Sequence, residues 1–403
     1  MKRLITNNET KKALWLGIIC SLSYLVVYIA RNILSAVTPQ MVEDGSFTAE
    51  NVGTFSSAFF TCYAIGQLIN GIVGDKIKAK YMMGFGLILA GVANVVFTQF
   101  SSYKIATVLS YSALGFFLSM IYAPMTRLVA ENTTSVYATR CSVGYSFAAL
   151  LGSPIAGLFA IFLTWQGVFN LGSALLVIMG VSCLALFTSF EKKGYIKSRQ
   201  VSKDEKPVGN VKDLFKRQIV KFTIISILTG VIRTTVVFWM PTFFSDKLGF
   251  SPQSSAAVFT VATLIISFCT LIAVAIYELL GRNMDLTILL SFSMSAVFFL
   301  ALYFVNHPIL SVICMVLAIM CSNFAASMLW SCYCPSLADT GLVSSATGFL
   351  DFVSYMSASV ASAMFMGAVD SIGWSGLILV WFAIMVVGIV ISLPLRRKKT
   401  EGE

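Results

Sequence analysis

"RNILSAVTPQM" (residues 31–41) and "RTTVVFWMPTFF" (233–244) both place an arginine eight residues before a proline in an otherwise apolar stretch. Each stretch then runs into a short loop with an acidic residue and a glycine, "EDGSF" (43–47) and "SDKLGF" (245–250). An arginine is costly to place in an apolar helix, so its recurrence in the same local pattern indicates a duplicated unit. The later pair "APMTRLVAENTT" (123–134) and "CPSLADTGLVSS" (334–345) repeats more loosely.

The composition around these stretches is that of a polytopic membrane protein. Of the 403 residues, 57% are hydrophobic and 11% are charged, and the mean hydropathy is +0.85. Apolar runs of about 20 residues, enough to cross a bilayer as a helix, follow one another with short interruptions. We expect twelve spans, at residues 13–35, 53–73, 80–99, 105–125, 141–163, 167–188, 220–243, 255–277, 285–304, 308–333, 342–368 and 374–394.

One long polar stretch, "EKKGYIKSRQVSKDEKPVGNVKDLFKRQIVK" (191–221), separates six spans from the other six. The sequence therefore predicts an all-α integral membrane protein with twelve transmembrane helices in two pseudo-symmetric six-helix bundles. The expected domains are an N-terminal bundle at 1–188, a cytoplasmic linker at 189–219, and a C-terminal bundle at 220–403 that ends in a short basic tail.

The positions of the positive charges predict the orientation. Most of the 28 Lys and Arg residues fall before span one, after spans two, four and eight, in the linker, and in the tail. Because basic loops stay on the cytoplasmic side, both termini are expected there, and the protein is expected in the cell inner membrane. Contact of these loops with the anionic surface of the lipid bilayer accounts for the net charge of +10 without nucleic-acid binding. We expect a monomer.

The sequence does not indicate an enzyme. It contains no HExxH motif, no phosphate-binding glycine loop, and one histidine, His307, in a short external loop. The nine cysteines fall within or at the ends of spans, and Cys332 and Cys334, two residues apart in a helix, would not face one another. We expect no metal and no cofactor.

Two cations lie inside the expected spans, Arg31 and Arg233, and one acid, Asp351, is a partner for them within the membrane. One carboxylate cannot balance two guanidinium groups, so we expect an anionic solute to supply the missing charge through the bidentate bonds that arginine forms with phosphate or carboxylate. The alternative is that both arginines are structural and bind backbone carbonyls or Asp351.

Polar residues at helical spacing extend from these charges. Tyr24, Tyr28, Arg31 and Ser35 form one stripe; Tyr63, Gln67 and Asn70 form a second; Asp351 and Tyr355 form a third. Tyrosine hydroxyls can bind the oxygens of an anion, whereas single tyrosines in spans are commonly packing residues or interfacial anchors. The alignment of three stripes favours a binding site.

The loop "GIVGDKIKAK" (71–80) resembles the loop motif of the major facilitator superfamily, with Gly71, Gly74, Asp75, Lys76 and Lys80 at marked positions. The chain further resembles the organophosphate:phosphate antiporter family of that superfamily, in "YLVVYIARN" (24–32), "APMTR" (123–127), "GVIRTTVVFWMPTFF" (230–244) and the stretch 332–376. The resemblance implies the major facilitator fold and covers most of both halves.

Carried over from that family, the phosphate-binding arginines correspond to Arg31 and Arg233. The site tyrosines correspond to Tyr24, Tyr28, Tyr63, Tyr333 and Tyr355.

The chain departs from the family where charges are expected. Asn32 and Gln67 replace lysines, and Phe238 replaces an acidic residue. Asp351 stands where a small residue is usual, and the span-five histidine is absent. The weaker positive potential indicates a substrate with less charge than a phosphate monoester dianion, for example a carboxylate, a sulfonate, a phosphodiester or a zwitterionic phosphate.

The resemblance implies secondary active transport of a small organic anion by alternating access, with inorganic phosphate exchanged in the opposite direction. Two alternatives remain open. Asp351 could bind and release a proton and so drive symport, or the protein could be a transporter-like sensor of sugar phosphate.

Overall fold

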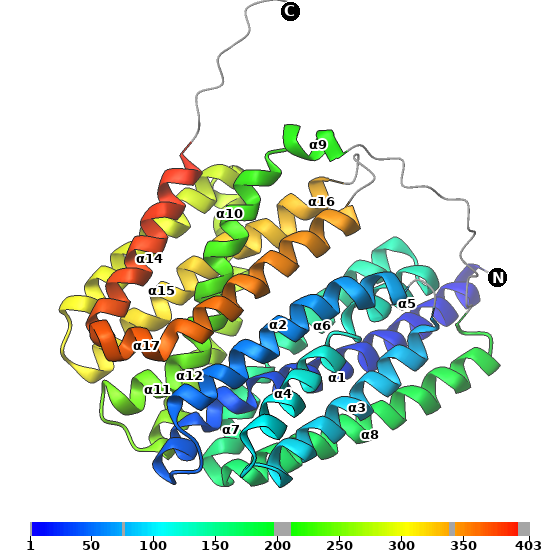
Figure 1. Cartoon of the computed structure of the whole chain (residues 1–403). Coiled ribbons are helices and arrows are strands. Elements are labelled where there is room, and N and C mark those ends of the chain that lie inside the picture. Colours follow the sequence, from blue (N-terminus) through cyan, green and yellow to red (C-terminus); the bar gives the residue numbers. More distant parts are fainter. Residues whose placement is uncertain (1, 75–76, 197–210, 338–342, 394–403) are drawn as a thin grey trace, which may run out of the picture.

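The computed structural model describes residues 2–74, 77–196, 211–337 and 343–393, and all regular structure in these ranges is helical (Figure 1). The first half of the chain contains α1 (Lys2–Glu43), α2 (Ala49–Gly74), α3 (Ala79–Gln99), α4 (Lys104–Leu118), α5 (Tyr122–Asn132), α6 (Ser135–Leu150), α7 (Gly152–Phe162) and α8 (Trp165–Lys192). Spans four and five are each divided in two. In both, a proline, Pro124 or Pro154, lies in the first turn of the second piece, where its missing N–H costs least.

The second half contains α9 (Val211–Lys216), α10 (Ile219–Gly230), η1 (Val231–Val236), α11 (Val237–Asp246), α12 (Pro252–Ser267), α13 (Cys269–Leu279), α14 (Met284–Phe304), α15 (Pro308–Met328), η2 (Leu329–Tyr333), α16 (Cys334–Ser336) and α17 (Val343–Ser392). The segments η1 and η2 are π-helical turns within spans seven and ten. Gly373, with φ 66° and ψ 174°, breaks α17 into two arms that supply spans eleven and twelve. This backbone conformation is open to glycine and strained for other residues.

The described helices confirm the predicted fold class. Among them, nine are long and apolar enough to cross a membrane, and Phe147–Phe162 and Pro252–Ser267 are shorter apolar helices. The first arm of α17 completes the twelve expected spans. The domain boundaries at 188 and 219 stay a prediction, and residues 197–210 of the expected linker lie outside the described ranges.

The two halves meet along α2 with α17, α7 with α12, and α1 with α11 (Figure 1). Hydroxyl groups join α2 to α17: Ser56 to Ser362 at 3.3 Å, Ser57 to Ser359 at 3.2 Å, and Thr61 to Ser359 at 2.6 Å.

A further hydroxyl, Ser267, donates to the Leu150 carbonyl at 2.8 Å. The α2–α17 bonds lie in the half of the molecule that the sequence predicts to be external, and the ends that carry α5 and α16 lie apart in Figure 1. We call the α2–α17 hydroxyl contacts the outer seam.

Within the first half, α3 and α8 approach one another closely at glycines. A Cβ atom added at Gly180 would lie 2.7 Å from the Gly84 carbonyl oxygen and 3.0 Å from the Ile88 nitrogen. Both neighbours are backbone atoms, which cannot swing aside as a side-chain end can. Small residues at such crossings allow helices in a membrane to pack by van der Waals contact, so the α3–α8 pair depends on this one.

We expect Gly180→Ala to lower the free energy of unfolding by about 1–3 kcal/mol, the usual cost of overpacking. Thermal unfolding of the purified protein in detergent would measure the change. Gly167→Ala, on the same helix, is the control, because its Cβ would meet ordinary contacts at 3.4 Å. An equal loss in both variants would contradict this description of the α3–α8 packing.

Candidate functional site

Arg31 lies on α1 inside a group of four aromatic rings. Its guanidinium carbon is 5.2 Å from the ring centroid of Tyr28, 5.5 Å from Phe60, 5.4 Å from Tyr63 and 4.7 Å from Tyr355. We call these four rings the aromatic cage. Ring faces attract a cation, and the attraction grows when the cation is removed from water. The cage therefore lowers the cost of a guanidinium group in an apolar span.

The cage is built from both halves of the protein. Arg31 Nη1 donates to the Tyr355 hydroxyl of α17 at 2.8 Å, and the Tyr63 ring of α2 meets the Tyr355 ring edge-on at 4.9 Å. Phe60 in turn meets Phe238 of α11 at 6.3 Å. Any relative movement of the halves must therefore change the surroundings of Arg31.

Arg233 has a different environment. It lies in the π-helical turn η1 and is half-buried, and among the described residues its side chain has no hydrogen bond and no ion pair. Thr235, in the same turn, donates to the Ala358 carbonyl of α17 at 3.2 Å and so fixes the turn against that helix. π-helical turns occur frequently at functional sites. The backbone of Arg233 is therefore held in place, and its five N–H donors have no acceptor in the part of the chain that the structure describes.

Asp351 lies on α17, four residues before Tyr355, and is half-buried. Its carboxylate interacts electrostatically with Arg233 and, more weakly, with Arg31. In the described part of the chain, neither arginine lies within 4 Å of it as an ion pair. The three predicted charges thus share one region without neutralising one another by direct contact.

Two of the other residues predicted for the site lie one helical turn from tyrosines of the aromatic cage. Tyr24 is buried and packs edge-on against Tyr28 at 4.9 Å and face to face with Tyr122 at 5.4 Å. Gln67 is half-buried on α2, one turn beyond Tyr63. Tyr24 thus contacts a ring of the cage, and Gln67 lies on the same face of α2 as Tyr63.

The side chains of the remaining predicted residues, Asn32 and Tyr333, bind partners other than the two arginines. The Asn32 amide donates to the Tyr28 carbonyl of its own helix at 2.6 Å. The Tyr333 ring stacks on Phe222 at 3.5 Å, and its hydroxyl donates to the Arg217 carbonyl at 3.0 Å.

Two members of the predicted stripes serve packing. Ser35 donates to the Phe238 carbonyl of the opposite half, and Asn70 donates to Ser119 Oγ at 2.7 Å, which joins α2 to α4. Spacing along one helix gives the face of a residue but not its depth or its partner, so these residues could not be separated from the site by sequence.

Three aromatic residues of this region, Phe60, Tyr122 and Tyr145, were not predicted from the sequence. Phe60 completes the cage and lies three residues before Tyr63 on the same helical face, which is the signal that could have identified it. Tyr145 meets the Tyr24 ring edge-on at 6.1 Å, and the Tyr122 ring contacts both, at 5.4 Å from Tyr24 and 6.3 Å from Tyr145. Neither tyrosine has a charged neighbour in sequence that would have marked it.

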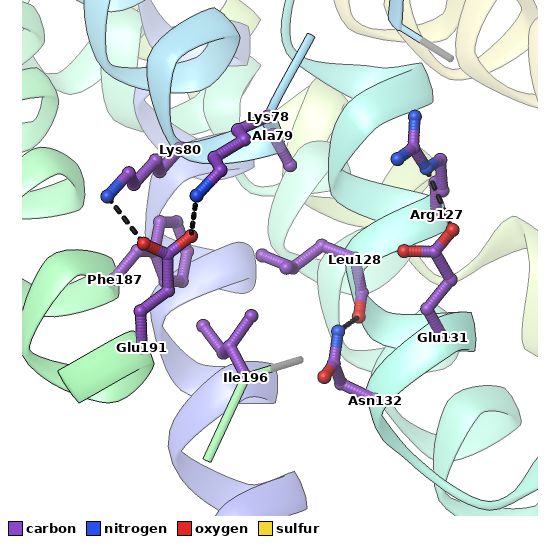
Figure 2. Close-up of a pocket in the computed structure, with 10 residues that line it drawn as sticks. All are labelled: Lys78, Ala79, Lys80, Arg127, Leu128, Glu131, Asn132, Phe187, Glu191 and Ile196. Atoms are coloured by element: carbon purple, nitrogen blue, oxygen red, sulfur yellow. Dashed lines mark hydrogen bonds and ion pairs between the residues drawn. The ribbon is translucent and has the colours of Figure 1, made fainter. Parts of the chain in front are cut away.

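The loop motif lies away from the arginines, at the predicted cytoplasmic end. Lys80 Nζ is 2.6 Å and Lys78 Nζ is 3.7 Å from the Glu191 carboxylate, so this acid at the end of α8 binds the start of α3 (Figure 2). Gly71 and Gly74 are in the last turn of α2, whereas Asp75 and Lys76 lie outside the described residues.

A small cavity beside these ion pairs, also lined by Arg127 and Glu131, has a volume of about 20 Å³ (Figure 2). That is room for about one water molecule. It is too small for an organic solute.

Comparison with known proteins identifies the family. Residues 20–362 match the Major Facilitator Superfamily. The phosphoglycerate transporter protein of Salmonella typhimurium is 24% identical over 92% of this chain and 85% of its own length, and the glycerol-3-phosphate transporter of Bacillus subtilis is 23% identical over 58% of each chain. The membrane sensor protein UhpC of Salmonella typhimurium is 33% identical, but the alignment spans 26% of this chain and 22% of the sensor.

Solved structures share the fold. The crystal structure of a bacterial homolog to the human lysosomal transporter Spinster, in an inward-facing and unoccupied conformation, has a TM-score of 0.76 at 10% identity and covers 94% of this chain and 96% of that one. A D-xylose-proton symporter has a TM-score of 0.72 at 12% identity, with 94% and 96% covered. The matched superfamily is one of transporters and not of enzymes. The relatives named above also confirm the resemblance to organophosphate:phosphate antiporters, and the chain belongs to the Major Facilitator Superfamily.

Proposed function

We propose that this protein is a secondary active transporter of a small organic anion, which Arg31 and Arg233 bind between the two halves. The observation that carries the proposal is the pairing of a caged arginine on one half with an arginine on the other whose side chain has no partner among the described residues. Arginines inside a membrane face a cavity or a counter-charge, and a planar guanidinium binds phosphate or carboxylate through two parallel bonds.

The geometry supports alternating access. The outer seam holds the halves together at the predicted external end, so in the proposed cycle this conformation is the one that is closed on the external side. An anion that bridges Arg31 and Arg233 links the two halves through charge. Movement of one half against the other would then close the cytoplasmic side and open the seam, with both termini cytoplasmic and the protein in the cell inner membrane.

The names of relatives support an organophosphate or a related phosphate, carboxylate or sulfonate compound as the substrate. A phosphoglycerate transporter and a glycerol-3-phosphate transporter both carry phosphate esters by name. Inorganic phosphate is then the expected coupling species, exchanged against the organic anion.

The test is counterflow in proteoliposomes preloaded with phosphate, with uptake of labelled phosphate as the measurement. Arg31→Ala and Arg233→Ala should each lower the exchange rate at least about tenfold, because a charge-assisted bond contributes about 1.5–3 kcal/mol. Lys104→Ala, which removes an exposed positive charge at the start of α4, is the control and should leave the rate unchanged. Full exchange in both arginine variants would refute the assigned site.

A second coupling mechanism has support in Asp351, because a carboxylate inside a span is a candidate proton carrier. Among the described residues, the charged and titratable groups that interact electrostatically with it are Arg233, Arg31, Tyr63, Tyr122, Tyr355 and Cys334.

Exchange coupling predicts that an imposed pH gradient drives no accumulation of substrate in the wild type or in Asp351→Asn. Proton symport predicts accumulation in the wild type that Asp351→Asn abolishes while it spares exchange. Uptake of labelled substrate with and without a pH gradient across the proteoliposome membrane separates the two.

Sensing is a further candidate function, because the chain aligns with a membrane sensor protein. The alignment is short, but its identity is higher than that with the two transporters. A sensor would bind the anion and show Arg31-dependent thermal stabilisation by it, but no counterflow. The two measurements together therefore distinguish a sensor from a transporter.

A further inference from the structure

We infer that the site selects solutes of one net negative charge and that Asp351 is the residue that sets this selection. The inference rests on the proposed function, since it concerns the substrate class of the same site. It assigns to Asp351 a role in specificity that is separate from proton coupling.

The formal charge of the side chains in the middle of the membrane sets the charge that a solute has to balance. Midway along the described spans lie three charged side chains, Arg31, Arg233 and Asp351, whose formal sum is +1. The positions where lysines would be expected hold Asn32 and Gln67, and Phe238 stands where an acid would be expected. During alternating access the site must be closed to water on both sides, and an unbalanced charge is then most costly. A solute of charge −1 makes the occupied site neutral.

Neither arginine forms an ion pair with Asp351 in the described part of the chain. The carboxylate is half-buried and, in the described structure, has no ion pair within 4 Å and no hydrogen bond. It lies one helical turn before Tyr355, whose hydroxyl accepts a hydrogen bond from Arg31 at 2.8 Å, and it is within electrostatic range of Arg233. An anion held between the two arginines is therefore close enough to Asp351 to be repelled by it, and each further negative charge on the solute adds to that repulsion.

The other residues that line the site carry no positive charge that would offset this repulsion. The aromatic cage offers ring faces and hydroxyls but no formal charge. The Asn32 amide gives one N–H to the Tyr28 carbonyl, and as a neutral group it adds no positive charge to the site. A phosphate monoester dianion would thus leave the site with a net charge of −1. A diester, a carboxylate, a sulfonate, or a phosphate ester that also carries an ammonium group would leave none.

The experiment compares two probes that differ by one charge: glycerol 3-phosphate and its methyl diester. The second pKa of a phosphate monoester is about 6, so at pH 8 the first probe is a dianion while the second is a monoanion. Efflux of each probe from proteoliposomes, driven by exchange, is measured for the wild type, for Asp351→Asn and for Asp370→Asn. Asp370 is exposed on the same helix α17 and serves as the matched control.

The wild type and Asp370→Asn should transport the diester about tenfold faster than the dianion, and Asp351→Asn should reverse this preference. A merely structural role for Asp351 would lower both rates and leave their ratio unchanged. Phosphoethanolamine, a monoester with an ammonium group, has the same net charge as the diester. It should be transported at a similar rate if the site selects by net charge. Thermal stabilisation of each purified variant by the same probes repeats the comparison without requiring turnover.

The outcomes separate this inference from the proposed function. If the wild type prefers the dianion, or if the ratio is the same in Asp351→Asn, the charge-selection role is wrong while anion transport by Arg31 and Arg233 stands. If no probe is exchanged and none stabilises the wild type, the proposed function fails and the inference fails with it.

Discussion

A guanidinium group in the middle of an apolar span needs surroundings that stabilise its charge, and the centre of this protein is arranged around that constraint. For Arg31 the surroundings are the aromatic cage and one hydroxyl. These groups come from α1, α2 and α17, so the solvation of one side chain ties three helices and both halves together. The cage stabilises the cation without neutralising it, and the positive charge stays available to a ligand.

The two arginines are related by sequence repetition but not by environment. Arg31 sits in a regular α-helix among rings, whereas Arg233 sits in a π-helical turn that Thr235 fixes against α17. A π-helical turn widens the helix and turns the residues after it around the axis. The pseudo-symmetry of the bundles is therefore broken at their centre: Arg31 is enclosed by aromatic rings, whereas the Arg233 side chain has no hydrogen-bond or ion-pair partner among the described residues.

The sequence alone could predict the fold class because hydropathy reports directly on membrane spans, and twelve apolar runs leave few alternatives. It could also single out Arg31, Arg233 and Asp351, since charges in such runs are rare. It could not predict where the Tyr333 side chain lies, because the helix ends in a π-helical turn that no sequence pattern indicates. Nor could it separate Ser35 and Asn70, whose hydroxyl and amide join helices, from the tyrosines on the same faces. Those distinctions depend on distance between helices, which periodicity does not contain.

The outer seam has a kinetic consequence. It joins the halves through hydroxyl pairs on α2 and α17, and the described residues of these two helices form no ion pair with one another. A neutral hydrogen bond contributes about 0.5–1.5 kcal/mol net, because water takes the place of either partner when the bond opens. The seam can thus part stepwise as water enters, without the desolvation penalty that re-forming a buried ion pair would impose in every cycle. In the proposed transport cycle, the main barrier would then be the rearrangement of charge at the arginines, in the middle of the membrane and not at its outer edge.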